Sequence, residues 1–178
     1  MKTLNFFGRA IVWAAVFLVL SCPAAPFLSF DRETFDRERK LWEAGDYKNY
    51  VFVQEYRNDA YPGGKVRITV SGSAEPVIEN LDEWVLEHQP PETWLDNAHY
   101  LAPTITEIYE RIDAFITEDI KQSSGENPLP ISDITCEIKY NPDFHYPEEV
   151  DYVVGYNKPI DGGAYFDLKI TDFYTLKD

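Results

Sequence analysis

The 178-residue sequence has few of the residue types on which metal binding and catalysis most often depend. It contains three histidines, two cysteines and one methionine. None of the histidines, His88, His99 and His145, lies at a spacing with cysteine, aspartate or glutamate that matches a compact zinc motif. The sequence also lacks the G-x-S-x-G, G-x-x-x-x-G-K-[ST] and G-x-G-x-x-G patterns. We therefore predict no metal and no cofactor, and no motif identifies a catalytic residue.

Basic residues are also scarce. The chain has 16 lysines and arginines against 31 aspartates and glutamates, which gives a formal net charge of −15 at pH 7. Proteins that bind nucleic acid need clustered Lys and Arg side chains to neutralise phosphates, so this class is excluded. The same balance argues against electrostatic attachment of the whole molecule to an anionic membrane. A negative surface is typical of an exported domain that stays soluble and monomeric, and recognition of a cationic partner or of Ca²⁺ is the alternative.

No apolar run reaches the ~20 residues that a helix needs to cross a bilayer. The run at residues 10–20 is 11 residues long, follows a short cationic head, and fits the ~7–15 residue core of a secretory signal. Its end, Val-Leu-Ser-Cys at residues 19–22, resembles the bacterial lipobox, in which the cysteine becomes the mature N-terminus and receives acyl chains. We therefore predict a signal peptide at residues 1–21 and lipidation of Cys22, with an unmodified cysteine as the alternative.

An acylated Cys22 places the protein in the bacterial cell envelope, with its domain in the periplasm or on the cell surface and the lipid bilayer as its first partner. Each buried CH₂ group contributes ~0.8 kcal/mol, so several chains on one cysteine form a durable anchor. Residues 22–30 are predicted to be a tether, and residues 31–178 a single domain. Cys136 then has no intrachain partner, and its place in a strand pattern of isoleucines predicts a small buried hydrophobe.

The spacing of apolar residues predicts two helices. Asp31 or Thr34 is expected to cap the first, which ends near Ala44. Its apolar side is formed by Phe35, Leu41 and Trp42. The second follows Thr104, because Thr104 and Glu107 form a capping box. Its apolar stripe consists of Ile105, Ile108, Tyr109, Ile112, Phe115, Ile116 and Ile120.

Alternating apolar and polar residues predict strands at residues 50–56, 65–70, 133–140, 149–156 and 164–174. The first two are expected to form a hairpin around a Pro-Gly-Gly turn. Residues 73–103 are rich in proline and tryptophan and are predicted to be an irregular insertion. The order α-β-β-insertion-α-β-β-β indicates an α+β fold, with an antiparallel sheet of about five strands and both helices on one face.

An ordered series of short motifs accompanies these elements. It begins with Leu-Trp at residues 41–42 and Asn-Tyr-Val-Phe at 49–52, continues with Val-x-Ile-x-Val at 66–70 and Thr-Ile-x-Glu-Ile-Tyr at 104–109, and ends with Tyr-Asn-Pro-x-Phe-x-Tyr-Pro at 140–147. The series resembles a family of bacterial lipoproteins that share a single domain of unknown function, and the resemblance covers most of residues 38–156. It implies a lipid-anchored α+β domain and supplies no catalytic residues. The chain departs from the family by lacking a cysteine pair between the first strands and by its long insertion.

Aromatic residues make up 15% of the chain and suggest two binding surfaces. In the insertion, Trp84, Trp94 and Tyr100 are candidates for a platform that binds a sugar or a protein; sealing the insertion onto the sheet is the alternative. The turn at residues 140–147 is a candidate recognition loop, and a purely structural turn is the alternative. Its candidate residues are Tyr140, Asn141, Phe144, His145 and Tyr146.

Three functional hypotheses follow. The first is a non-enzymatic, membrane-tethered interaction module whose partner is an envelope protein. The second is a lipoprotein that binds a small ligand or glycan through the aromatics of the insertion. The third is a cryptic hydrolase around Asp143, His145 and Glu148. Acidic residues near the same turn also offer oxygen ligands for Ca²⁺, although no EF-hand pattern accompanies them.

Overall fold

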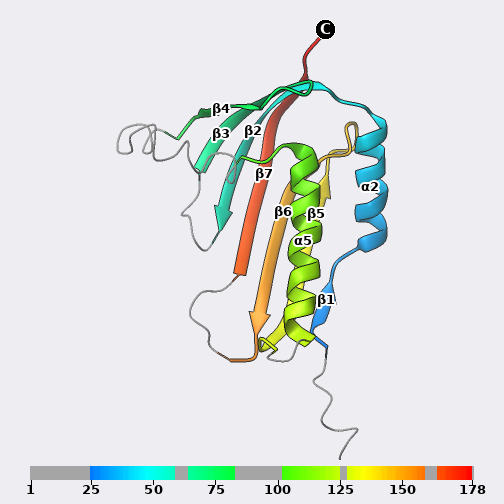
Figure 1. Cartoon of the computed structure of the whole chain (residues 1–178), viewed down its shortest axis with the longest axis vertical. Helices are drawn as coiled ribbons and strands as arrows, with labels where there is room; N and C mark the ends of the chain where they lie inside the picture. The colour runs from blue at the N-terminus through cyan, green and yellow to red at the C-terminus, as the bar shows by residue number, and fades with distance from the viewer. Residues whose placement is uncertain (1–24, 59–63, 83–101, 125–127, 159–163, 178) are drawn as a thin grey trace, which may run out of the picture.

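In the residues that the computed structural model describes, two helices pack on one face of a single twisted sheet (Figure 1). These residues are 25–58, 64–82, 102–124, 128–158 and 164–177. The elements are β1 (Phe27–Ser29), α2 (Arg32–Ala44), β2 (Asn49–Asn58), β3 (Gly64–Ser71), β4 (Val77–Asn80), α5 (Ile105–Ser124), β5 (Ile131–Tyr140), β6 (Pro147–Tyr156) and β7 (Ala164–Thr175). The described strands are ordered β1-β5-β6-β7-β2-β3-β4 across the sheet.

The predicted antiparallel sheet of about five strands is wrong. The described residues form seven strands, and the sheet is mixed because β1 runs parallel to β5 while the other neighbours are antiparallel. Both unforeseen strands lie at the edges of the sheet. β1 falls within residues 22–30, where the sequence predicts a tether, and β4 falls within the predicted insertion. With three and four residues, they are too short for an alternating pattern to stand out.

The two predicted helices are confirmed, together with their N-terminal caps. Asp31 caps α2 by accepting a hydrogen bond from the Thr34 backbone N–H at 2.9 Å. At α5, the Thr104 hydroxyl accepts from the Glu107 N–H at 3.3 Å, while the Glu107 carboxylate accepts from the Thr104 N–H at 2.7 Å. These reciprocal bonds satisfy two donors that the first helical turn cannot pair internally.

The core lies between the helices and the inner face of the sheet, which is the face that they cover. From α5, the predicted stripe is buried from Ile105 to Ile116 with Phe115 partly buried. Two predicted core positions are wrong: Ile120 is 39% exposed and Leu41 is 40% exposed. Ile120 lies near the end of α5, beyond the last buried isoleucine of the stripe, whereas Leu41 precedes the buried Trp42 and lies off the face of α2 that carries Phe35 and Trp42. Cys136 is buried on this inner face, as its strand pattern predicts.

An aromatic cluster closes the core beside the C-terminal end of α2. It consists of Trp42, Tyr47, Tyr50, Phe144, Tyr146 and Phe173, whose ring centroids lie 4.6 to 6.5 Å apart. The cluster joins α2, β2, β7 and the turn between β5 and β6, four segments that are far apart in the chain. Edge-to-face and offset contacts of this kind add to the stabilisation from burial alone.

A β-bulge in β7 supplies one ring of this cluster. The pairing register of β2 with β7 shifts between Val51 and Val53. Asp172 stands at the shift with a φ of 51°, a left-handed conformation that aspartate tolerates better than most residues because its short side chain bonds locally. The additional residue changes the alternation of the strand, so that Phe173 packs on the helix side against Trp42.

The helices in the described part of the chain are amphipathic. Neither of them is long and apolar enough to cross a membrane.

Candidate functional site

The sequence-predicted site residues divide into two groups. Cys22 and the insertion aromatics Trp84, Trp94 and Tyr100 lie outside the described residues. The five turn residues, Tyr140, Asn141, Phe144, His145 and Tyr146, all lie where the hairpin of β5 and β6 meets α2 and the first half of α5.

Asn141 organises the turn between β5 and β6. Its side-chain Oδ1 accepts hydrogen bonds from the backbone N–H groups of Asp143 and Phe144, each at 3.0 Å. Its backbone N–H donates to the Tyr146 carbonyl, and its carbonyl accepts from the His145 N–H, both at 2.9 Å. His145 takes a left-handed φ of 62°. One asparagine thus closes the loop through side chain and backbone together, which explains this residue type at this position.

His145 connects the turn to both helices. Its ring Nδ1 lies 2.8 Å from Glu38 Oε2 on α2, and Glu38 also accepts from the Arg37 guanidinium. The Tyr109 hydroxyl on α5 donates to the backbone carbonyl of His145 at 2.5 Å. Burial raises the pKa of the Tyr109 phenol, so it remains a donor throughout the ordinary pH range. The strained residue of the turn is therefore held from two sides.

The aromatic side chains of the turn point inward. Tyr146 is 4% exposed, and Phe144 and Tyr140 are partly buried against the core. Pro142 and Asp143 are the exposed residues at the tip. The contacts of the turn are thus those expected of a structural connection, and any recognition by it would rest on this small tip.

The Glu38 carboxylate gives the turn a pH-dependent contact. Burial raises its pKa, but hydrogen bonds from Arg37 and His145 outweigh burial and hold the pKa below the ordinary value of 4.5. Because the folded pKa is depressed, the carboxylate stabilises the fold above its unfolded pKa, and this contribution is lost as the pH falls through the folded pKa.

Glu38→Gln is therefore expected to lower the free energy of unfolding near neutral pH and to leave it unchanged at a pH below the folded pKa, where both side chains are neutral. Urea unfolding across this pH range measures the difference. Glu110→Gln, at an exposed position on α5, is the control and should track the wild type throughout. If Glu38→Gln lowered the free energy of unfolding by the same amount at both ends of the pH range, the ionised Glu38 carboxylate would not be the source of the stabilisation.

Two of the three residues of the hydrolase hypothesis are engaged in other contacts. The His145 ring bonds Glu38, and Glu148 forms an ion pair with Lys139 at 2.8 Å. Asp143 lies exposed at the tip of the turn. Among the described residues, no group of three or more His, Cys, Asp or Glu side chains is placed to hold a metal ion.

A second titratable pair joins α5 to β6. The Tyr152 hydroxyl donates to the Asp119 carboxylate, and burial raises the pKa of both groups. The bond fixes the second half of the helix over the sheet, at a place where Phe115 packs on the Tyr152 ring. The hydrogen bond between Tyr152 and Asp119 is thus a polar contact in an otherwise apolar interface between α5 and the sheet.

The outer face of the sheet, which the described helices leave uncovered, carries charged rows that cross the strands. One row alternates in sign: the strand register aligns Lys139, Glu149, Lys169, Glu55 and Lys65. Within it, Lys169 pairs with Glu149 at 3.5 Å and Lys65 with Glu55 at 3.0 Å. Opposite charges on directly paired positions favour this register over a shifted one.

The neighbouring row of the outer face is acidic. It aligns Glu137, Asp151 and Asp167, and ends at Arg57. Burial raises the pKa of Asp167, and the adjacent Asp151 raises it further. The alternation within each strand predicts outward charges, but only the register shows that like charges meet.

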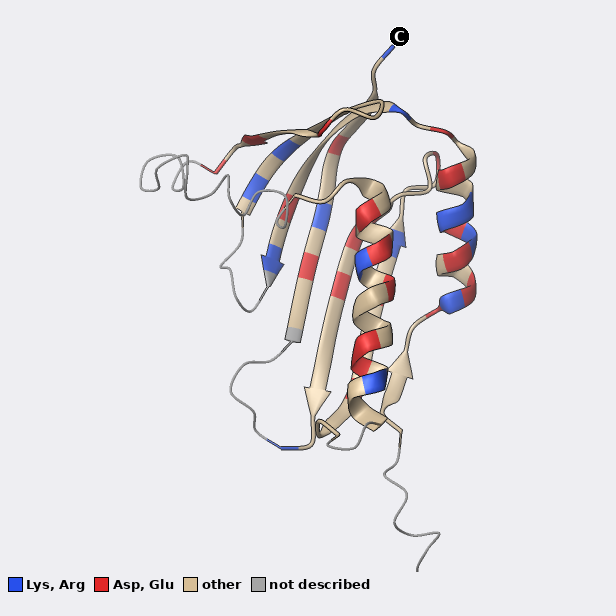
Figure 2. Ribbon diagram, in the orientation of Figure 1, with Lys and Arg blue, Asp and Glu red and all other residues tan. Residues whose placement is uncertain are grey.

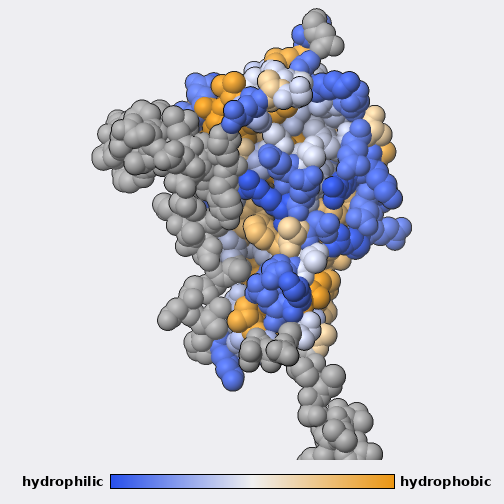
Figure 3. Space-filling view, viewed as in Figure 1, coloured by the Kyte–Doolittle hydropathy of each residue, from blue (hydrophilic) through white to orange (hydrophobic). Residues whose placement is uncertain are grey.

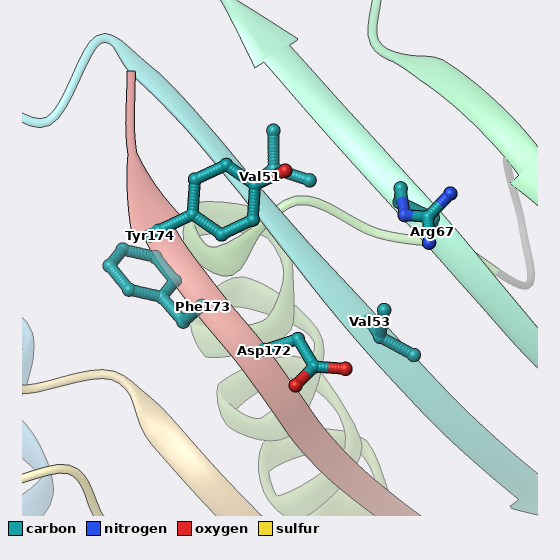
Figure 4. A pocket seen from close by; sticks show the side chains of 6 residues that line it. All are labelled: Val51, Val53, Arg67, Asp172, Phe173 and Tyr174. Atoms are coloured by element: carbon teal, nitrogen blue, oxygen red, sulfur yellow. The ribbon is translucent and has the colours of Figure 1, made fainter. Parts of the chain in front are cut away.

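A shallow hollow of about 500 Å³ lies on the outer face beside the β-bulge (Figure 4). It is lined by Val51, Val53, Arg67, Asp172, Phe173 and Tyr174. In the close-up, α5 lies behind the strands, so the hollow is on the side away from the core helix. Arg67 at its rim bonds Glu79 at 2.6 Å. The hollow was not predicted, although residues 50–53 form an unbroken apolar run, a pattern that indicates a strand apolar on both faces.

Comparison of the chain with protein-family models, with curated proteins and with solved structures found no match.

Proposed function

We propose that this protein is a lipid-anchored domain of the bacterial cell envelope that acts by binding an envelope protein, not by catalysis. The observation that carries the proposal is the closeness of Cys22, the lipobox cysteine, to the folded domain: β1 starts at Phe27. Five residues extend at most about 18 Å. An acyl group on Cys22 would thus hold the domain close to a bilayer.

The binding role is supported by the arrangement of the polar groups. The turn histidine and its neighbouring carboxylates are engaged in contacts that hold secondary structure together. The outer face presents ordered rows of charge on strands, which are rigid elements. A rigid charged face suits recognition of a complementary protein surface.

A second candidate function, small-ligand binding, is favoured by the hollow on the outer face. Its volume of about 500 Å³ falls in the range of ~300–1,000 Å³ that is usual for ligand sites. Val51 and Val53, which are only 4% and 3% exposed, line the hollow beside the guanidinium of Arg67. Calorimetric titration with soluble sugars and short aliphatic acids tests this, with Val53→Trp as the filled variant. Equal or absent heats in both proteins would exclude it.

The test of the anchor is mass spectrometry of the native protein together with membrane fractionation. We expect a product that begins at Cys22, carries acyl chains and sediments with membranes. Cys22→Ala is expected to lose the acyl mass and nearly all of the membrane-bound mature form. Cys136→Ala, at a buried position, is the matched control and should remain membrane-bound. A native product with a bare amino terminus would overturn the proposal.

A further inference from the structure

One end of the domain brings together the start of β1, the last turn of α5, the start of β5 and the end of β6; we name it the proximal end. It comprises the described residues 25–29, 120–124, 128–132 and 155–158. β1 begins here because it runs parallel to β5. The Leu129 N–H donates to the Gln122 carbonyl at 3.0 Å, and the Asn157 N–H to the Pro130 carbonyl at 2.7 Å. In Figure 1 this end lies at the bottom, away from the C-terminus.

Large hydrophobic side chains are exposed at the proximal end. Phe27 is 71% exposed, Leu28 40%, Leu129 41% and Ile120 39%. They are four of the nine large hydrophobic side chains that are exposed in the described part of the chain. Hydrophobic surface is visible beside β1 in Figure 3. Exposed apolar groups concentrated in one region of an acidic, otherwise charged surface indicate contact with an apolar phase or a partner.

The charge of the proximal end differs from that of the whole molecule. Its described residues include Lys121 and Lys158 and no aspartate or glutamate, although the chain has 31 acidic residues. The Lys121 side chain is 77% exposed, and its Nζ lies 3.4 Å from Glu118, one turn back along α5. Asp119 and Asp133 directly adjoin these ranges, and Asp133 pairs with Phe27 in the sheet. Figure 2 shows acidic residues spread along both helices and across the sheet, above this end. Glu126 and Asp161 belong to adjoining segments outside the described residues.

The position of Cys22 indicates that the proximal end faces a membrane. Cys22 precedes Phe27 by five residues, a span of at most about 18 Å, and two of the intervening residues are prolines, which restrict the tether. The end that carries the apolar side chains and the lysines is therefore the end that the tether holds nearest the bilayer. Exposed lysines beside apolar side chains match an interface of anionic headgroups and acyl chains.

We propose that the proximal end docks on the membrane surface through Phe27, Leu28, Ile120 and Leu129, with Lys121 and Lys158 at anionic headgroups. This inference rests on the proposed lipid anchor. Docking at this end orients the strands roughly along the membrane normal, so that the aromatic cluster and the C-terminus point away from the bilayer. The outer face is then presented sideways to partners in the same membrane.

The test places an environment-sensitive fluorophore on Leu129→Cys in the full-length, acylated protein, reconstituted in vesicles of phosphatidylethanolamine and phosphatidylglycerol. Tyr174→Cys, which is 50% exposed in the wild type and lies near the other end, is the control. Burial raises the pKa of the Cys136 thiol to about 12, so it stays unlabelled, and acylation blocks Cys22. We expect nitroxide-labelled lipids to quench the Leu129 label severalfold more than the Tyr174 label.

Charge reversal provides a second, independent measurement that leaves the core intact. Lys121→Glu with Lys158→Glu is expected to reduce quenching at the Leu129 label by more than half, whereas Lys48→Glu with Lys177→Glu, near the other end, should leave it unchanged. If the Leu129 variant does not fold, Ile120→Cys replaces it as the labelled site.

The outcomes separate this inference from the anchor on which it rests. Acylated protein whose two labels are quenched equally overturns the docking and leaves the anchor standing. Protein without acyl mass overturns both. Energy transfer between Leu129 labels on different copies, independent of the quenching lipid, would show that a second copy covers this end and would also overturn the docking.

Discussion

Trp42→Ala is expected to lower the free energy of unfolding by about 3–5 kcal/mol, the range for truncating a large aromatic side chain in a core. Trp42 is 4% exposed and its ring meets those of Tyr47, Tyr50 and Phe173 at 4.8, 5.4 and 6.0 Å. The indole Nε1–H also donates to the Thr106 hydroxyl at 3.3 Å. The substitution therefore removes the contact through which α2, β2, β7 and α5 meet.

Urea unfolding followed by far-ultraviolet circular dichroism measures this loss, and two variants calibrate it. Trp42→Phe keeps an aromatic ring and should lose less. Leu41→Ala, at the neighbouring residue with 40% exposure, should change stability by about 0.5 kcal/mol or less. If Trp42→Ala and Leu41→Ala were equally mild, the aromatic cluster would not be the centre of stability that the packing indicates.

The helices and the long strands were predictable because each carries local information. Asp31 and Thr104 are cap residues within one helical turn of the first apolar residue of their helices, and their hydrogen bonds are formed as predicted. The strand β3 alternates over enough residues to fix which face is buried. Such features depend on neighbours within a few positions of the chain.

The edge strands were not predictable because their pairing is determined elsewhere in the chain. β1 acquires its conformation from hydrogen bonds to β5, more than a hundred residues later, and its sequence, Phe-Leu-Ser, has no period of its own. β4 directly follows Pro76 and pairs with β3 over four positions. A three- or four-residue strand contributes too few side chains for its alternation to differ from that of a loop.

In the candidate site, too, local features were predictable from the sequence and contacts between distant segments were not. The tight turn at Asn141 was predictable from residue type, since asparagine and proline favour turns. That His145 bonds Glu38 across 107 positions of sequence was not, because α2 and the turn meet only in the folded sheet. The hollow beside Val53 depends on the register shift at Asp172, and a bulge leaves no period in the sequence.

Tyr109→Ala is the second substitution with a large expected effect, again about 3–5 kcal/mol. Tyr109 is 1% exposed, its ring contacts those of Phe35 at 5.4 Å and Tyr140 at 6.5 Å, and its hydroxyl reaches the His145 carbonyl. Packing and hydrogen bonding can be separated at this residue. Tyr109→Phe keeps the ring and removes only the donor, which should cost about 1 kcal/mol.

Tyr109→Phe also tests whether the Tyr109 hydroxyl stabilises the turn between β5 and β6. Without the Tyr109 hydroxyl, only the ring contact with Glu38 holds His145 in its left-handed conformation against the helices. Tyr109→Phe should therefore accelerate amide hydrogen exchange at residues 143–146 and leave exchange in β2 and β3 unchanged, because those strands open only with the whole domain. Tyr174→Phe, which alters an exposed hydroxyl, should change neither stability nor exchange. Uniform acceleration throughout the sheet in Tyr109→Phe would mean that the hydroxyl supports the core as a whole and that the turn has no separate stability of its own.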